Sequence, residues 1–241
     1  REVAIYAESN GLVNNVIIYD HHSIKHQENV AQIITNIKRN IDRRLFSCTY
    51  TPIINCKDGR TFGYDCSLSA PKSVVYSISS MLDYASHNNF LVDLLRVLYI
   101  ETNHAYSSRS SVAYTNQFLT MSIKLSYYEE IIDIFTRIQR PRNVNTIFIL
   151  NDKDIDEIDV DETISILKKL KHSNLTIGLE ITSTSLTLLP EIVKQFDYFI
   201  INGNSFTNLK ESQHLILFSD MITRLGSYKG TIIATELKTW V

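Results

Sequence analysis

Short apolar runs alternate with amphipathic stretches along most of this chain. From residue 46 onward the apolar runs are rich in β-branched and aromatic residues, which favours strands. Seven runs are predicted to be strands, at residues 47–54, 61–68, 118–125, 145–150, 175–181, 198–203 and 231–237. Between them, helical spacing of apolar residues predicts helices at 74–100 (broken in two), 127–139, 162–171, 191–196 and 209–225. This alternation is typical of repeated βα units around a mainly parallel sheet.

The first 45 residues follow a different pattern. Ile33, Ile37 and Ile41 recur at helical spacing and predict an amphipathic linker helix over residues 27–45. Ahead of it, the sequence predicts a helix end, a turn marked by glycine and a short strand. We therefore expect residues 1–26 to be the tail and linker of a separate, preceding unit.

Composition is that of an ordinary globular protein. The 241 residues are 44% hydrophobic and 21% charged, which is enough for a barrel-sized core. The formal net charge of −2 argues against a nucleic-acid partner, and the basic cluster at residues 38–44 is interpreted as a solvated helix face. No apolar run approaches the roughly 18 residues of a membrane span.

The cysteines bear on the compartment. Cys48, Cys56 and Cys66 make an odd count and contain no C-x-x-C motif, so neither a disulfide framework nor a zinc site is expected. This favours a reducing compartment, with the cytoplasm as the default.

Seven motifs follow one another at the predicted strand ends. They are YTPI (50–53), FGYDCSL (62–68), MSIKLS (121–126), IFILND (147–152), ITSTSLTLL (181–189), FDYFIINGNSF (196–206) and IIATELKT (232–239). In order and spacing they resemble the motifs of the EAL domain family, bacterial cyclic di-GMP phosphodiesterases. The resemblance covers residues 46–241 and implies an α/β, TIM-barrel-like (β/α)8 fold. The family has an eighth strand after the seventh, so we expect this region to be incomplete at its C-terminal end.

The stretch AIYAESNGLVNNVIIYD (4–20) similarly resembles the last helix and strand of a GGDEF domain. GGDEF and EAL domains often occur in tandem. The chain therefore resembles the junction and the EAL half of a bacterial GGDEF–EAL protein.

In the family, carboxylates and an asparagine at the strand ends hold divalent metals, and a lysine supports the attacking water. The corresponding positions here are Asp65, Ser69, Lys124, Ile149, Glu180, Ile181, Ile200, Asn202, Thr235 and Lys238. By this resemblance Ile149 replaces a glutamate, Ile181 an aspartate and Ile200 the lysine. Mg²⁺ and Mn²⁺ require several hard oxygen ligands, which apolar side chains do not supply. The resemblance therefore implies a degenerate site with no catalysis, no bound metal and no other cofactor.

Substrate contacts have changed as well. Ser69 stands where the family has an arginine that contacts phosphate, and a hydroxyl does not replace a bidentate guanidinium clamp. The preferred hypothesis is a catalytically inactive module that binds a protein partner or a second copy of itself. Two alternatives stay open, a receptor domain that binds cyclic di-GMP without cleaving it and, less favoured, an active phosphodiesterase.

One further motif is acidic. The run NDKDIDEIDVDE (151–162) resembles a calcium loop, but an EF-hand requires glycine where Glu157 stands and glutamate where Thr163 stands. We interpret this run as a solvated loop whose carboxylates lie near the N-terminus of the next helix.

Overall fold

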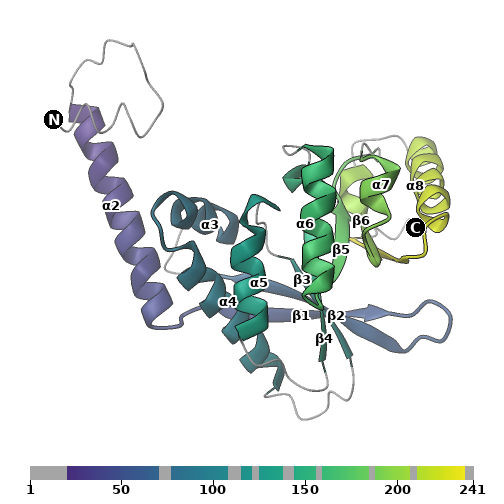
Figure 1. Cartoon of the computed structure of the whole chain (residues 1–241), viewed down its shortest axis with the longest axis horizontal. Helices are drawn as coiled ribbons and strands as arrows, with labels where there is room; N and C mark the ends of the chain where they lie inside the picture. Colours follow the sequence, from purple (N-terminus) through teal and green to yellow (C-terminus); the bar gives the residue numbers. More distant parts are fainter. Residues whose placement is uncertain are drawn as a thin grey trace. The chain divides into compact units, whose positions relative to one another are not determined.

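The structure is a computed structural model that describes residues 21–70, 77–107, 115–120, 125–137, 144–155, 159–184, 188–206 and 211–236. The chain divides into two compact units, Arg1–Arg44 and Leu45–Val241. The described part of the first unit is one helix, α2 (His21–Asp42), labelled in Figure 1. It begins at His21 rather than at residue 27, because residues 21–26 contain no glycine or proline to end it. Ile33 and Ile37 on this helix are buried.

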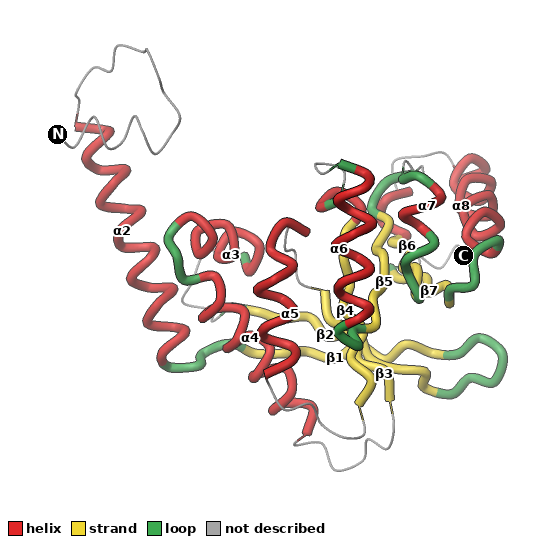
Figure 2. Tube along the Cα trace, in the orientation of Figure 1, coloured by secondary structure: helices red, strands yellow, loops and turns green. Residues whose placement is uncertain are grey.

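The second unit is built on a seven-stranded sheet whose strand order follows the chain. Its strands are β1 (Ser47–Ile54), β2 (Thr61–Ser69), β3 (Thr115–Thr120), β4 (Val144–Asn151), β5 (Thr176–Ile181), β6 (Tyr198–Asn202) and β7 (Thr231–Thr235). β1 and β2 form an antiparallel hairpin, and each later pair is parallel. The prediction of a mainly parallel α/β sheet is confirmed. The sheet curls in the manner of a TIM-barrel-like fold (Figure 2).

Helices connect the parallel strands. They are α3 (Ile78–His87), α4 (Leu91–Ser107), α5 (Tyr128–Arg137), α6 (Val160–His172), α7 (Pro190–Val193) and α8 (Glu211–Gly226), with short 3-10 helices η1 (Leu125–Tyr127), η2 (Asp152–Asp154) and η3 (Gly203–Phe206). The predicted break within 74–100 falls between α3 and α4, where Asn89 has a left-handed φ of 59°. α6 begins earlier than residue 162, because Asp159 caps it by accepting the N–H groups of Asp161 (3.0 Å) and Glu162 (3.4 Å). None of the helices in the described ranges is long and apolar enough to cross a membrane.

The strand predicted at 118–125 was placed wrongly. β3 ends at Thr120, and the chain is helical again from Leu125. In the run FLTMSIKL, apolar and polar residues alternate from Leu119 to Leu125, so the sequence pattern favours a strand past Thr120 and does not show where the strand ends. Lys124, a position implied by the family resemblance, lies outside the described residues, as does Lys238.

An apolar cluster covers the concave face of the sheet. Its buried members are Phe118, Ile147, Ile149, Ile200 and Ile233, with Ile53, Phe62 and Tyr198 packed against them. The ring of Phe118 meets the ring of Tyr198 edge-on, with centroids 5.2 Å apart. The strand register places Ile149 beside Gly178 and Ile200 beside Ile233. Hydrocarbon therefore extends along the interior from β3 to β7.

This packing requires Gly178. A Cβ atom added at Gly178 would lie 2.7 Å from Cδ1 of Ile149, well inside van der Waals contact. We expect Gly178→Ala to lower the free energy of unfolding by about 1–3 kcal/mol through overpacking, measured by urea unfolding. Ile149→Val removes that Cδ1 methyl group. The double variant should therefore lose less stability than the sum of the two single variants.

The matched control is Gly226→Ala. A Cβ atom at this position meets no atom within 4 Å, and alanine favours a helix over glycine. Gly226→Ala should leave the free energy of unfolding unchanged or raise it slightly. If the double variant loses as much free energy of unfolding as Gly178→Ala and Ile149→Val lose together, the close packing of residue 178 against Ile149 is contradicted.

Candidate functional site

The carboxyl ends of the parallel strands meet at one edge of the sheet, where α/β folds commonly place their chemistry. Four of the positions implied by the resemblance are half-buried there: Asp65, Glu180, Asn202 and Thr235. Ser69 is exposed at the last position of β2. We call the edge formed by these strand ends the mouth of the sheet.

The strand register fixes the neighbours of Glu180. Asn151, Glu180, Ile200 and Ile233 form one row across β4 to β7. Two residues further along, Asn202 pairs with Thr235, and the Asn202 amide donates a hydrogen bond to Glu180 Oε1 at 3.4 Å. The Glu180 carboxylate therefore lies between an amide and a row of isoleucines.

The three isoleucines in the set of implied positions differ in placement. Ile149 and Ile200 belong to the core cluster and are 2% and 7% exposed. Ile181 is fully buried, but it follows Glu180 directly in β5, and successive strand residues point to opposite faces. Ile181 therefore does not share the face of the sheet on which Glu180 lies.

Burial dominates the electrostatics of Glu180. Loss of water around the carboxyl group raises its pKa, and the hydrogen bond from Asn202 opposes this rise. The charges of Asp65, Asp152 and Asp154 raise the pKa further. Glu180 thus lies in a region of negative charge.

The same cause raises the pKa of Asp65. Burial is the largest contribution, and the Ser67 hydroxyl, which donates to Asp65 Oδ2 at 3.4 Å, acts against it. The charge of Glu236, just beyond the end of β7, raises the Asp65 pKa as well. Asp65 and Glu236 therefore lie near each other although β2 and β7 are not paired.

The side chains at the mouth do not fit a divalent metal of the kind that the family resemblance implies. Such a metal takes about six oxygen ligands. Between Asp65 on β2 and Glu180 on β5, the sheet presents Phe118 and Ile149, which have only hydrocarbon side chains. Within the ranges described above, no three His, Cys, Asp or Glu residues are grouped so as to hold a metal.

Sequence reasoning missed the role of Asp152. The acidic run was expected to be solvated, and at Asp152 this is wrong, because the residue is 4% exposed. Its carboxylate accepts hydrogen bonds from the Thr182 N–H (3.2 Å), the Thr182 hydroxyl (2.7 Å) and the Ser183 hydroxyl (3.1 Å). Asp152 directly follows β4 and Thr182 directly follows β5, so the parallel register was the signal that brings them together. Asp152 holds the start of the Ser/Thr-rich turn after β5.

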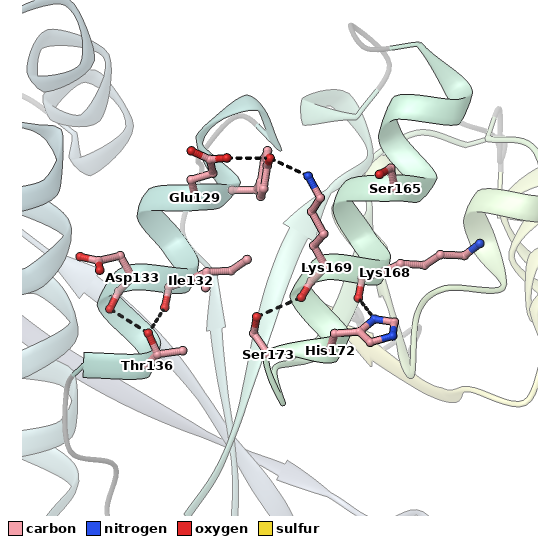
Figure 3. A pocket seen from close by; sticks show the side chains of 10 residues that line it. Glu129, Ile132, Asp133, Thr136, Ser165, Lys168, Lys169, His172 and Ser173 are labelled. Atoms are coloured by element: carbon pink, nitrogen blue, oxygen red, sulfur yellow. Dashed lines mark hydrogen bonds between the residues drawn. The ribbon is translucent and has the colours of Figure 1, made fainter.

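Described residues of the second unit line, among others, the following two hollows. One, of about 700 Å³, is lined by the two edge strands β1 and β7 and includes Asp65, Thr235 and Glu236. The other, of about 830 Å³, lies between α5 and α6, on the helices rather than at the mouth (Figure 3).

Polar groups in the hollow between α5 and α6 are largely bonded to one another. Lys169 Nζ donates to the Tyr128 hydroxyl at 3.0 Å and lies 4.9 Å from the ring centroid, and that hydroxyl donates to Glu129 Oε1 at 2.9 Å. Ser173 and Thr136 donate to carbonyl groups of their own helices (Figure 3). These polar groups therefore have hydrogen-bond partners within the protein, and no ligand is needed to satisfy them.

Comparison with known proteins gives the class of the fold. No protein-family profile and no curated protein sequence matches this chain. Solved structures do match it. The PaMucR phosphodiesterase in complex with c-di-GMP has 15% sequence identity and a TM-score of 0.66, over 86% of this chain and 87% of that one. The FimX EAL domain from Pseudomonas aeruginosa, bound to c-di-GMP, has 13% identity and a TM-score of 0.64, over 86% of each chain.

A longer protein also matches. The Vibrio cholerae LapD S helix-GGDEF-EAL structure, bound to c-di-GMP, has 13% identity and a TM-score of 0.62, over 97% of this chain and 58% of that one. Identities this low establish the fold alone. The second unit is thus a TIM-barrel-like α/β domain whose fold is that of EAL domains.

The anchoring role of Asp152 is testable. We expect Asp152→Ala to lower the free energy of unfolding by about 1–3 kcal/mol, because it removes the buried acceptor that the Thr182 N–H and the Thr182 and Ser183 hydroxyls share. Amide hydrogen exchange at Thr182 should speed up more than exchange in the body of β5. Asp83→Asn, at an exposed aspartate on α3, is the control and should change neither quantity. Unchanged exchange at Thr182 in Asp152→Ala would rule out the anchor.

The raised pKa of Glu180 predicts a pH dependence. A folded-state pKa above the ordinary value of 4.5 means that the native state binds the proton more tightly than the unfolded state. The stabilising contribution is complete below pH 4.5 and is lost as the pH rises through the folded-state pKa. Glu180→Gln should therefore raise Tm by up to a few degrees at pH 7 and have no effect near pH 4. The control is Glu191→Gln, at an exposed glutamate on α7, whose Tm difference from wild type should not change with pH. If the Tm of Glu180→Gln relative to wild type is lower at pH 7 than at pH 4, the assignment is contradicted.

Proposed function

We propose that the second unit is an EAL-type domain that does not hydrolyse cyclic di-GMP and acts through contacts with a protein partner or a second copy of the chain. The supporting observation is the placement of Ile149 and Ile200 in the apolar core directly below the mouth. The family resemblance assigns a metal-binding glutamate and a lysine to these positions. Metal-assisted attack on a phosphodiester requires ligands that hold the ion and orient the water. Two hydrocarbon side chains supply neither.

The charge at the mouth also argues against tight binding of the nucleotide. Burial raises the pKa of both Asp65 and Glu180, and the charge of Asp65 raises the pKa of Glu180 further. A phosphodiester would bring more negative charge to these carboxyl groups. Ser69, at the exposed end of β2, offers a single hydroxyl where the resemblance assigns an arginine. A neutral hydroxyl does not offset this repulsion.

Exposed apolar side chains support a role in protein contacts. Leu215, Ile216 and Ile222 on α8 are 57%, 67% and 38% exposed. Large apolar side chains grouped on one helix are typical of interaction surfaces. The match of LapD over 97% of this chain supports a GGDEF–EAL arrangement, in which residues 1–26 are the tail of the GGDEF domain and 27–45 the linker. The cysteine pattern favours the bacterial cytoplasm for such a protein.

A second candidate is a receptor that binds cyclic di-GMP without cleaving it. The FimX and LapD structures, both bound to c-di-GMP, favour it, because this fold accommodates the nucleotide in those proteins. The hollow of about 700 Å³ that includes Asp65 gives this candidate space in the present chain.

Titration with cyclic di-GMP separates the candidates. At up to about 100 μM cyclic di-GMP, with or without Mg²⁺ or Mn²⁺, we expect no heat of binding in calorimetry. We also expect chromatography to detect none of the linear dinucleotide that hydrolysis would produce. A site with a Kd of about 1 μM would stabilise the native state by about 2.7 kcal/mol under these conditions, or about 5–10 °C in Tm. The PaMucR phosphodiesterase serves as the positive control. Binding without product would establish the receptor, and metal-dependent product would falsify the non-catalytic assignment.

A further inference from the structure

Two of the three cysteines are neighbours on the β1–β2 hairpin. Cys48 pairs with Leu68, and Cys66 pairs with Tyr50, two residues further along β1. The two cysteines are therefore diagonal neighbours whose side chains point to the same face of the sheet. The register of this one hairpin brings them together, so their contact depends on no other part of the chain.

The two thiols lie under α4 and form a hydrogen-bonded pair. Tyr50, on the same face of the hairpin, donates its hydroxyl to the Thr102 carbonyl of α4 at 2.7 Å. Cys66 is fully buried, whereas Cys48 is half-buried. The Cys66 thiol has two acceptors within reach, the Tyr64 carbonyl at 3.7 Å and the Cys48 sulfur. When Cys48 is a thiolate, its charged sulfur is the stronger acceptor of the two.

This contact favours the charged form of Cys48. The pKa of Cys48 is lowered from 9.0 to about 7, and the hydrogen bond from Cys66 is the largest cause. Burial and the charge of Asp65 oppose the shift, while the polar side chains of Tyr50 and Thr102 add to it. The same hydrogen bond, together with burial, raises the pKa of Cys66. At neutral pH Cys48 is thus the nucleophile of the pair, and Cys66 stays a thiol.

Neither a metal nor a permanent disulfide explains the pair. Structural zinc takes four ligands, and in the described ranges no third His, Cys, Asp or Glu joins these cysteines to hold a metal. Diagonal neighbours lie about 7–8 Å apart at Cα, slightly beyond the roughly 4.4–6.8 Å of most disulfides. A disulfide between them requires β1 and β2 to move closer, and strained disulfides are the readily reduced ones.

We propose that Cys48 and Cys66 form a redox modification site that hydrogen peroxide oxidises to a reversible intramolecular disulfide. The Cys48 thiolate attacks the peroxide, which gives a sulfenic acid on Cys48 and a hydroxide ion. The Cys66 thiol then attacks that sulfur. The S–S bond forms, the S–O bond breaks, and the Cys66 proton leaves with the oxygen as water. A thiol reductant, itself oxidised to a disulfide, restores both thiols.

The cross-link acts on the end of the hairpin that reaches the mouth. Ser47 pairs with Ser69 at this end, next to the two cysteines. A covalent bond between Cys48 and Cys66 holds the start of β1 on the end of β2, so amide hydrogen exchange in residues 47–49 should slow on oxidation. This inference goes beyond the proposed function. None of its readouts involves a nucleotide, so the two proposals fail separately.

The test uses the Cys56→Ser variant, because Cys56 is exposed and shares a tryptic peptide with Cys48. The variant is treated with hydrogen peroxide at neutral pH, its free thiols are blocked, and its tryptic peptides are analysed by mass spectrometry. We expect two peptides joined through Cys48 and Cys66, two hydrogen atoms lighter than the free pair and separated by dithiothreitol. Thiols that stay free, or a cross-link between two chains on a non-reducing gel, overturn the proposal.

Two substitutions at Cys66 in the same background assign the roles. In Cys66→Ser a hydroxyl keeps the hydrogen bond but forms no disulfide, so dimedone should trap a sulfenic acid on Cys48. Cys66→Ala removes the hydrogen bond and should slow the oxidation of Cys48 about fivefold. Cys48→Ser is the matched control, in which the buried Cys66 should not react.

Equal oxidation rates of Cys48 in the serine and alanine variants, or a sulfenic acid on Cys66, overturn the assigned roles. The cross-link itself is measured with both cysteines in place. It therefore remains decisive if a substitution at the buried Cys66 unfolds the chain.

Discussion

The apolar filling of the concave face is the constraint on which the rest of this domain depends. Parallel strands are buried on both faces, so their inward residues must be hydrocarbon wherever no ligand replaces it. Here the filling continues to Ile149 and Ile200, directly beneath the strand ends. Gly178 shows how tightly it is packed, because its neighbour Ile149 occupies the space that any side chain would need. The interior thus stabilises the fold at the level where a catalytic EAL domain is expected to place polar groups.

Polar side chains near the mouth hydrogen-bond to one another and to the backbone. Asp152 orders the turn after β5 through three hydrogen bonds, and Asn202 donates to Glu180. Asp65 and Glu180 keep carboxyl groups whose burial is unfavourable while they are charged. Fold and chemistry are separable in principle, because the same scaffold can carry different side chains at this edge.

The alternation of strands and helices was predictable from the sequence, because each βα unit carries its own apolar pattern. The break between α3 and α4 was predictable for the same reason. The end of β3 was not, since apolar and polar residues continue to alternate past Thr120 as they would in a longer strand. The opposite facing of Glu180 and Ile181 follows from the period of a strand and was available in the sequence. The burial of Asp152 was harder to predict, because it depends on donors thirty residues away that only the sheet register brings near.

The order of the strands has a consequence for how the domain forms. Each described strand pairs with the one synthesised just before it, so no pairing closes a loop longer than the one from Ser69 to Thr115 and the sheet grows in one direction from the β1–β2 hairpin. Contacts of this kind lower the entropy cost of folding and permit assembly during synthesis. A direct joining of β1 to β7 would instead close a loop from residue 54 to residue 231. Among the described strands, the sheet can therefore form from the β1–β2 hairpin to β7 without any pairing that spans most of the domain.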